Sequence, residues 1–491
     1  MSIDTSRLNL FSFNGKMRIL HLSWMAFFIS FFVWFNHAPL LAMMRDSMGL
    51  TTQQIKTLLI LNVALTIPAR IIIGMLVDAF GPRSIFSMLL FVSSFLCFGF
   101  AMAEDYEQLA LMRFLLGFVG AGFVIGTRMI GEWFPAKQIG LAQGIYGGWG
   151  NFGSAGAAVL LPTVALMFGG DDGWRWAVGS TGVVALIYSA VYFFSVSDTP
   201  KGSTYFKPKK NGALEITSRF DFFLYLVMNI PLYAALAVLT WKLSPGNLAM
   251  LSEGVTTIIY VILVSLYVFQ TIRIYQINKH VFTEQVPEIE RYKFKQVAVL
   301  NLSYMVTFGS ELAVVSILPL FFMDTFNLSA VQAGLVASVF AGLNLIMRPA
   351  GGWFSDRFGR KITLTILMAG VGVGYYLLSL ITSEWSLSLA ISAVVFCSLF
   401  VNAGNGAVYA IIPLVKRRLT GQISGMTGAY GNVGAVTFLT VLSFVATDVF
   451  FMVIAVFAIV VFLLIAFLLE DPKEQMAEIM PDGTVQMIEV D

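Results

Sequence analysis

The sequence is poor in charged residues. Asp, Glu, Lys and Arg make up only 12% of its 491 residues, about half the share found in soluble globular proteins. The 30 Lys and Arg residues nearly balance the 28 Asp and Glu residues, so the formal net charge is +2 and no strongly basic face exists to bind a polyanion. These shortages exclude a soluble enzyme, a disordered chain and a nucleic-acid-binding protein.

Cysteine and histidine are scarce as well. Cys97 and Cys397 both lie in apolar runs, which is typical of small core residues and not of a disulfide or a metal pair. The three histidines, His21, His37 and His280, are scattered along the chain. We therefore expect no metal and no cofactor. Because no cluster of a nucleophile and a base is visible either, we expect no enzymatic activity.

Apolar residues dominate the chain instead. They make up 58% of it, and the mean hydropathy is +0.81. A helix needs about 20 apolar residues to cross a bilayer, and lipid cannot satisfy unpaired backbone groups. The pattern therefore predicts an all-α polytopic membrane protein. About fourteen runs have near-bilayer length, at residues 19–44, 55–78, 84–103, 107–134, 138–168, 174–197, 220–241, 252–272, 297–325, 329–353, 361–382, 386–415, 419–446 and 447–470.

The connections between these runs alternate in charge. The basic ones hold Arg83, Lys137, Lys207–Lys210, Lys279–Lys295, Arg357–Lys361 and Lys416–Arg418, and the acidic ones hold Glu104–Glu107, Asp171–Asp172 and Ser383–Trp385. The positive-inside rule then places both termini in the cytoplasm, with the protein in the plasma or inner membrane. Because no cleavable signal is evident before the first apolar run, we expect that run to be retained.

Two internal repeats relate the halves of the chain. Arg70, Gly74, Asp78, Phe80, Gly81 and Arg83 match Arg348, Gly352, Asp356, Phe358, Gly359 and Lys361, each with an offset of 348 − 70 = 278 positions. The glycine-rich segments 144–153 and 425–434 also match, with an offset of 425 − 144 = 281. The repeats predict two parallel six-helix bundles that rock around a midplane site, as in secondary transporters.

This scheme divides the chain into four parts. We expect the N-terminal bundle at residues 1–200 and the C-terminal bundle at 296–470. Residues 201–295 lie between them and hold an inserted two-helix hairpin with its linkers, and 471–491 form an acidic cytoplasmic tail. Such a transporter is expected to work as a monomer in the lipid bilayer.

Arg70 and Arg348 are the leading site candidates. Each lies eight residues before an Asp at a helix end, which is about 12 Å of helix and places it near mid-membrane. An arginine there costs about 2.5–3.5 kcal/mol on insertion scales, which points to a functional role. A fixed arginine pair suits a small oxyanion, because the guanidinium binds it with two hydrogen bonds and stays charged. The alternative is a pair of structural arginines bonded to carbonyl groups or carboxylates.

Several other residues could complete such a site. The repeated glycine segments each contain an asparagine beside a glycine, and these side chains could bond a substrate or a neighbouring helix. Tyr304, Phe308 and Glu311 share one helix face, and a mid-membrane glutamate is a candidate either for proton coupling or for a counter-ion to an arginine. The secondary candidates are Gly150, Gly431, Asn432 and Arg128. The Arg128 side chain could instead snorkel to the membrane surface. We expect gating loops at Asp78, Arg83, Asp356 and Lys361.

These motifs resemble a known family. The loops 74–83 and 352–361 resemble the cytoplasmic signature loops of the major facilitator superfamily. Within it, the glycine segments are similar to the paired signatures of the nitrate/nitrite porter family. Pro39-Leu40, Arg45-Asp46 and Gly309–Leu312 look most like cyanobacterial and eukaryotic nitrate transporters. The resemblance covers the chain except the hairpin near 220–272 and the tails.

The resemblance implies the fold of that superfamily and a role in nitrate assimilation. Arg70 and Arg348 match the family's substrate arginines, and Phe123, Asn151, Tyr304 and Phe308 match the residues that surround the anion. We expect secondary active transport of nitrate or nitrite by alternating access, with proton symport through Glu311. The alternatives are a nitrate/nitrite exchanger, a facilitator for a different small anion, and a membrane sensor whose hairpin contacts a partner.

Overall fold

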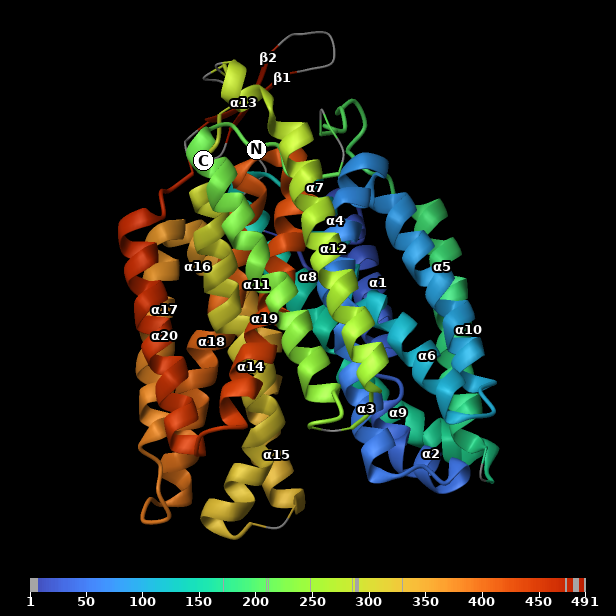
Figure 1. The fold of residues 1–491 in the computed structure, drawn as a ribbon. Helices are drawn as coiled ribbons and strands as arrows, with labels where there is room; N and C mark the ends of the chain where they lie inside the picture. Colours follow the sequence, from blue (N-terminus) through green and yellow to red (C-terminus); the bar gives the residue numbers. More distant parts are fainter. Residues whose placement is uncertain are drawn as a thin grey trace.

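The computed structural model describes residues 8–472, except 171, 209, 211, 248, 285, 288–290 and 329, and the two strands of the tail. Asp171 and Lys209, two of the charged residues that orient the chain, lie outside the described residues. Helices run back and forth through one bundle, and α1 begins and α20 ends at the same end of it, called here the termini end (Figure 1). The all-α prediction is confirmed for the bundle.

The first half of the bundle is drawn from blue to green in Figure 1. It consists of α1 (Gly15–Trp34), η1 (Ala38–Leu40), α2 (Leu41–Met48), α3 (Thr52–Ala64), α4 (Thr66–Phe80), α5 (Pro82–Ala101), α6 (Tyr106–Leu116), η2 (Gly117–Ala121), α7 (Gly122–Trp133), α8 (Ala136–Asn151), α9 (Gly153–Phe168) and α10 (Gly173–Ser195). Several of these helices are two pieces of one predicted membrane span.

The second half runs from yellow to red and repeats the plan of the first (Figure 1). It consists of α14 (Phe294–Phe326), α15 (Ala330–Gly342), α16 (Asn344–Phe358), α17 (Arg360–Ser379), α18 (Leu387–Val415), η4 (Arg417–Leu419), α19 (Thr420–Leu442) and α20 (Thr447–Leu468). In the tail, β1 (Gln475–Ile479) and β2 (Val485–Glu489) pair antiparallel, and these strands were not predicted. The other residues beyond 472 in the predicted acidic tail lie outside the described part.

Thirteen helical segments of the described chain are long and apolar enough to cross a membrane. The fourteenth predicted run, 419–446, corresponds to α19, which is not among them. Its glycines, threonines and asparagine lower its hydropathy. Because α19 packs between α4 and α14 and is buried along most of its length, it presents little surface that would need to be apolar for lipid.

Two equivalent spans are interrupted inside the bundle. Leu65 separates α3 from α4, and Leu343 separates α15 from α16. The offset of the two breaks is 343 − 65 = 278 positions, the same as that of the arginine motif. Leu65 and Leu343 keep right-handed helical dihedral angles, and backbone hydrogen bonds join each of them to the helix that follows. Each interruption is therefore a local irregularity in a continuous helical path, five residues before the central arginine of its half.

The inserted hairpin lies between the halves in sequence and packs on one side of them (Figure 1). Its first helix, α11 (Arg219–Leu243), contacts α14 and α19, whereas α12 (Glu253–Asn278) contacts chiefly α11 and is exposed along most of its length. The short α13 (His280–Thr283) follows. An apolar cavity of about 760 Å³ separates the hairpin from α4. The predicted domain boundaries at residues 200, 295 and 470 stay a prediction.

Candidate substrate site

Arg70 and Arg348 approach the centre from opposite halves. Each is the fifth residue of its helix, since α4 begins at Thr66 and α16 at Asn344. Each side chain is buried, with about 1% of the residue exposed. The two guanidinium groups are therefore buried at equivalent positions of the two halves.

Arg70 reaches across the interface between the halves. Its Nη1 donates a hydrogen bond to the Gly428 carbonyl of α19, and its Nε donates to the Gly120 carbonyl at 3.3 Å. The guanidinium carbon lies 5.5 Å from the centre of the Phe308 ring. Arg70 is thus held by one carbonyl from each half and covered by an aromatic ring of the other half.

Arg348 is also covered by a ring of the opposite half, but its hydrogen bond stays within its own half. Its Nη2 donates to the Tyr304 hydroxyl at 3.0 Å, and its guanidinium carbon lies 4.7 Å from the Phe123 ring of the first half. Its Nη1 is buried and has no hydrogen-bond partner. Within the described part of the chain, no carboxylate lies within ion-pair distance of either central arginine. Arg128 also has a buried Nη1 without a partner, but Arg128 is paired with carboxylates, so Arg348 differs in lacking one. A buried cation without a carboxylate partner suits a small anion.

Arg113 shows what a structural arginine looks like in this bundle. Its Nη2 donates to the Trp34 carbonyl at 2.9 Å and to the Asn62 side chain at 2.7 Å. Its Nη1 donates to the Asn36 side chain at 3.1 Å and lies at the same distance from His37 Nδ1. Both terminal nitrogens of Arg113 therefore have partners and only its Nε lacks one, whereas Arg348 lacks a partner at the terminal nitrogen Nη1.

Aromatic side chains line the same region. The Tyr304 and Phe308 rings stack at 5.0 Å with an angle of 5° between their planes. Tyr409, which was not predicted, lies edge-on to Tyr304 at 4.9 Å and to Phe123 at 4.4 Å. The rings of the two halves thus meet through Tyr409. Phe123 and Phe308 each cover a different arginine.

The repeated glycines fit directly behind the two arginines. A Cβ atom added at Gly147 of α8 would lie 2.6 Å from Arg348 Nε, and one added at Gly428 would lie 3.1 Å from Arg70 Cδ. One at Gly431 would lie 2.7 Å from the Phe308 ring, and one at Gly150 would overlap the Phe27 ring. The glycine segments therefore leave room for the central cations and rings, in addition to bringing helices close.

We expect Gly147→Ala to reduce uptake of the small anion predicted for this site about tenfold or more, because the added methyl displaces the Arg348 guanidinium and overpacking costs about 1–3 kcal/mol. Labelled-anion uptake by cells with matched amounts of membrane protein measures the loss. Gly179→Ala in α10 is the matched control, since nothing lies within 4 Å of a Cβ there. Equal losses in both variants would contradict a specific role for Gly147.

The two asparagines of the glycine segments differ in their surroundings. Asn432 is fully buried, and both polar atoms of its amide lack a partner. Asn151 is the last residue of α8 and is half-buried. The alternative of an interhelical hydrogen bond is therefore not observed for Asn432. A buried amide without partners is costly, and a bound anion would satisfy its donor.

Glu311 lies in α14 of the second half, seven residues after Tyr304. It is 6% exposed, and its two carboxylate oxygens accept hydrogen bonds from Asn344 Nδ2 at 3.0 Å and Asn405 Nδ2 at 2.6 Å. It forms no ion pair with Arg70 or Arg348, although its charge acts on Arg348. The two asparagines were not predicted. The signal was available in the sequence, because asparagine is rare in an apolar span and Asn402 and Asn405 both lie within the apolar run that forms α18.

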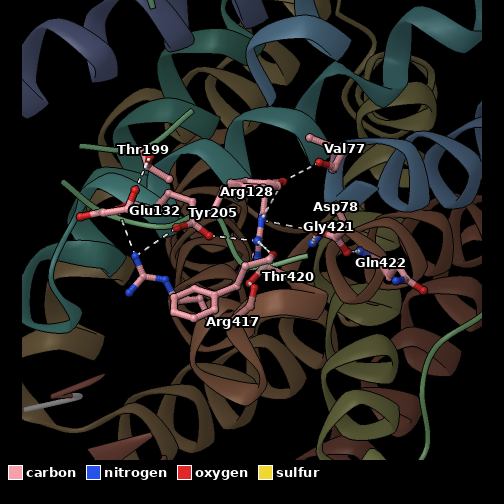
Figure 2. Close-up of polar contacts among 12 residues, drawn as sticks. Val77, Asp78, Arg128, Glu132, Thr199, Tyr205, Arg417, Thr420, Gly421 and Gln422 are labelled. Atoms are coloured by element: carbon pink, nitrogen blue, oxygen red, sulfur yellow. Dashed lines mark hydrogen bonds and ion pairs between the residues drawn. The ribbon is translucent and has the colours of Figure 1, made fainter. Parts of the chain in front are cut away.

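The signature aspartates join the halves at the termini end. Asp78, near the end of α4, accepts from the backbone N–H groups of Gly421 and Gln422 at 2.9 and 2.8 Å, which begin α19 (Figure 2). Asp356 accepts from Gly140 and Leu141 at 3.0 and 2.9 Å in α8. Asp78 thus caps the first turn of α19, where the dipole favours negative charge, whereas Asp356 binds α8 at its fifth and sixth residues. Both carboxylates hold the two halves together at this end.

Arg128 belongs to the termini end and not to the central site. Its guanidinium pairs with Glu132 at 3.0 Å and Asp78 at 3.5 Å, and Glu132 also pairs with Arg417 of the other half at 3.2 Å (Figure 2). The expectation that Arg128 snorkels is wrong, because its side chain is 0% exposed and neutralised by these carboxylates. Tyr205, from the linker after α10, accepts from Arg128 Nε at 3.2 Å.

Arg83 and Lys361 bind within their own halves. The backbone N–H of Arg83 donates to Asp198 at 2.8 Å, and that of Lys361 donates to Asp471 at 2.9 Å. Burial raises the pKa of the Asp198 carboxyl. These two basic residues therefore fix the loops, while the aspartates make the contacts across the interface.

We expect Asp78→Asn to open the termini end about tenfold more often, because hydrogen bonds to a charged group contribute about 1.5–3 kcal/mol. A cysteine introduced as Gln422→Cys reports the opening through its labelling rate with a water-soluble maleimide. Asp46→Asn, at an exposed residue of the opposite end, is the control. Unchanged labelling in the Asp78 variant would show that the cap does not hold this end closed.

Comparisons with known proteins agree with this architecture. The family model of the Major Facilitator Superfamily matches residues 23–281 and 300–483. The chain is 45% identical to "Nitrate/nitrite transporter NrtP" of Picosynechococcus sp., covering 96% of each protein, and 44% identical to the protein of that name from Nostoc punctiforme, covering 95% of each.

More distant proteins match as well. "Probable nitrate/nitrite antiporter NarK1" of Thermus thermophilus is 25% identical over 85% of this chain and 83% of its own length. Among solved structures, the E. coli fucose:proton symporter FucP matches with a TM-score of 0.63 and 11% identity, covering 92% of this chain and 99% of that one. That likeness supports the fold alone.

Proposed function

Because the chain belongs to the Major Facilitator Superfamily, and within it to the family of the two nitrate/nitrite transporters named above, we propose that it carries nitrate and nitrite across the membrane. The observation that carries the proposal is the pair of buried guanidinium groups at the centre, which come from opposite halves and have no carboxylate partner among the described residues. A neutral substrate would leave this charge uncompensated in a low-dielectric interior.

The proposed binding mode uses both arginines. Arg348 Nη1 and the free edge of Arg70 would donate to the anion oxygens, and the Tyr304 hydroxyl together with Asn151 or Asn432 would complete the hydrogen bonds. Phe123 and Phe308 would flank the flat face of the anion. This geometry favours trigonal nitrate and bent nitrite over tetrahedral sulfate, which has no flat face to pack between rings.

Transport is proposed to proceed by alternating access. We assign the termini end to the cytoplasm, because the connections rich in Lys and Arg lie there. The hydrogen bonds of Asp78 and Asp356 across the interface would hold that end closed until the anion binds, and their release would let the halves rock around the central site. Each central arginine touches the opposite half, so a bound anion acts directly on the moving interface.

Energy coupling has two candidates. Moving an anion into a negative interior costs about 2.3 kcal/mol per charge per 100 mV, so uptake needs a driving ion. Proton symport through Glu311 is the first candidate, because this carboxylate lies at membrane depth beside the site. Nitrate/nitrite exchange is the second, favoured by the name of the Thermus relative, an antiporter.

Flux measurements with purified protein in liposomes test the function and separate the two candidates. We expect nitrate accumulation driven by an inward proton gradient without internal nitrite, and nitrite transport at the same site. Uptake that requires internal nitrite and ignores the proton gradient would favour exchange. A protein that moves neither anion under any gradient, as a sensor would, contradicts the proposal.

A further inference from the structure

Glu311 is part of a three-residue polar layer that the nitrate-binding residues do not account for. Its carboxylate joins three helices of the second half: α14 supplies Glu311, α16 supplies Asn344 and α18 supplies Asn405. All three side chains are buried, with exposures of 6%, 6% and 0%. A buried carboxylate with two amide donors and no cation in ion-pair contact is an unusual arrangement, because buried charges are normally paired.

This layer stacks directly on the substrate layer. Asn344 precedes Arg348 by four residues in α16, and Asn405 precedes Tyr409 by four residues in α18. Glu311 follows Tyr304 by seven residues in α14, which runs in the opposite direction. Residues four or seven apart share a helix face. Each member of the polar layer therefore lies one or two turns from a member of the site, on the side away from the termini end.

Hydrogen-bond accounting favours the carboxylate form of Glu311 in the observed layer. Both amides donate, one to each oxygen, and neither presents an acceptor to a carboxyl O–H. The oxygens Asn344 Oδ1 and Asn405 Oδ1 are buried and lack partners. A protonated Glu311 becomes a donor and needs an acceptor. Turning either amide over by half a rotation would supply one of these unpaired oxygens.

We propose that Asn344 and Asn405 are positioning residues that hold Glu311 as a carboxylate and reverse their amides when it takes up a proton. This inference rests on the proposed nitrate transport. The proton comes from the outer solution, binds one carboxylate oxygen of Glu311, and leaves that oxygen for the cytoplasm after the halves have rocked. No other covalent bond changes.

The proton is linked to the anion through Arg348. Glu311 interacts electrostatically with Arg348 of α16, Tyr375 of α17 and Tyr304 of its own helix. Cys397 of α18 lies beside Tyr375. Protonation of Glu311 removes a negative charge near Arg348 and so strengthens anion binding there. By linkage, a bound anion strengthens proton binding equally.

The test is equilibrium binding of labelled nitrate to the full-length protein in lipid nanodiscs across a pH range. Wild-type affinity should fall as pH rises through the ionisation of Glu311. Asn344→Leu and Asn405→Leu should each move the midpoint about one unit to higher pH, because each removes a hydrogen bond that stabilises the carboxylate. Asn402→Leu is the matched control: Asn402 is equally buried in α18 but bonds Phe340 and Ser398.

Serine variants provide a second test if the leucine variants do not fold. The hydroxyl in Asn344→Ser or Asn405→Ser can donate and accept, so these variants should bring the midpoint back toward that of the wild type. A midpoint that stays at the wild-type pH in both leucine variants, or moves equally in Asn402→Leu, would overturn the inference while nitrate binding itself survives. Absence of nitrate binding by the wild type at every pH would instead overturn the proposed function.

Discussion

Replacing Arg348 by Lys should reduce nitrate transport at least a hundredfold while the protein still reaches the membrane. The guanidinium of Arg348 donates through Nη2 to Tyr304 and keeps Nη1 free for an anion. A lysine ammonium keeps the charge but is a point donor and cannot make both bonds in one plane. Loss of about two charge-assisted hydrogen bonds corresponds to about 3 kcal/mol or more.

Arg70→Lys should behave in the same way, because the repeat gives the two arginines equivalent positions and Arg70 also bridges the halves through Gly428. Uptake of labelled nitrate, with membrane protein measured by immunoblot, gives the result. Arg45→Lys is the control, since Arg45 is exposed and pairs with its neighbour Asp46. Normal uptake in either central variant would remove that arginine from the site.

Replacing Glu311 by Gln should abolish concentrative uptake but leave nitrate exchange. The glutamine fills the same volume and still accepts a hydrogen bond, yet it cannot carry a proton. Exchange of labelled for unlabelled nitrate needs no net proton movement, so its rate should stay within a few-fold of the wild type. The expected loss is the whole gradient of nitrate that an imposed proton gradient would otherwise drive.

Two flux modes on the same liposomes check this expectation. Accumulation is measured with an inward proton gradient, and exchange is measured at equal nitrate and equal pH on both sides. Glu384→Gln, in an exposed loop after α17, is the control variant. Proton-driven accumulation by the Glu311 variant at the wild-type level would exclude Glu311 as the coupling group, and loss of both modes would assign it to folding or anion binding instead.

Most of the fold can be predicted from the sequence because its strongest signals are local or repeated. Apolar runs define the helices, and the offset of 278 positions alone pairs Arg70 with Arg348. The same offset appears in the breaks at Leu65 and Leu343. The low hydropathy of α19 does not prevent its prediction as a helix, because its glycine segment repeats that of the first half and so implies an equivalent helix.

Contacts between distant helices cannot be predicted in the same way. Nothing in the sequence near Asn344 or Asn405 shows that both side chains bind Glu311, because only the fold brings them together. Arg128 resembles a residue near the membrane surface, because nothing local shows that Asp78 and Glu132 surround it. Tyr205 lies in a linker that carries no motif, so only the folded chain reveals its contact with Arg128.

The cross-half contacts explain why the glycine repeats accompany the arginines. Gly147 of the first half lies behind Arg348 of the second, and Gly428 of the second lies behind Arg70 of the first. Any side chain at these glycines would meet one of the two central guanidinium groups. The repeated glycines and the repeated arginines therefore belong to one structural arrangement. Each half contributes one central arginine and the glycine that makes room for the arginine of the other half.

Equilibrium binding of labelled nitrate to the purified protein tests the central claim most directly. We expect saturable binding at one site per chain, competition by nitrite but not by sulfate, and loss of binding in both Arg70→Lys and Arg348→Lys. Sulfate that competes as strongly as nitrite, or nitrate that binds both lysine variants as tightly as the wild type, would contradict a planar-anion site built from these two arginines.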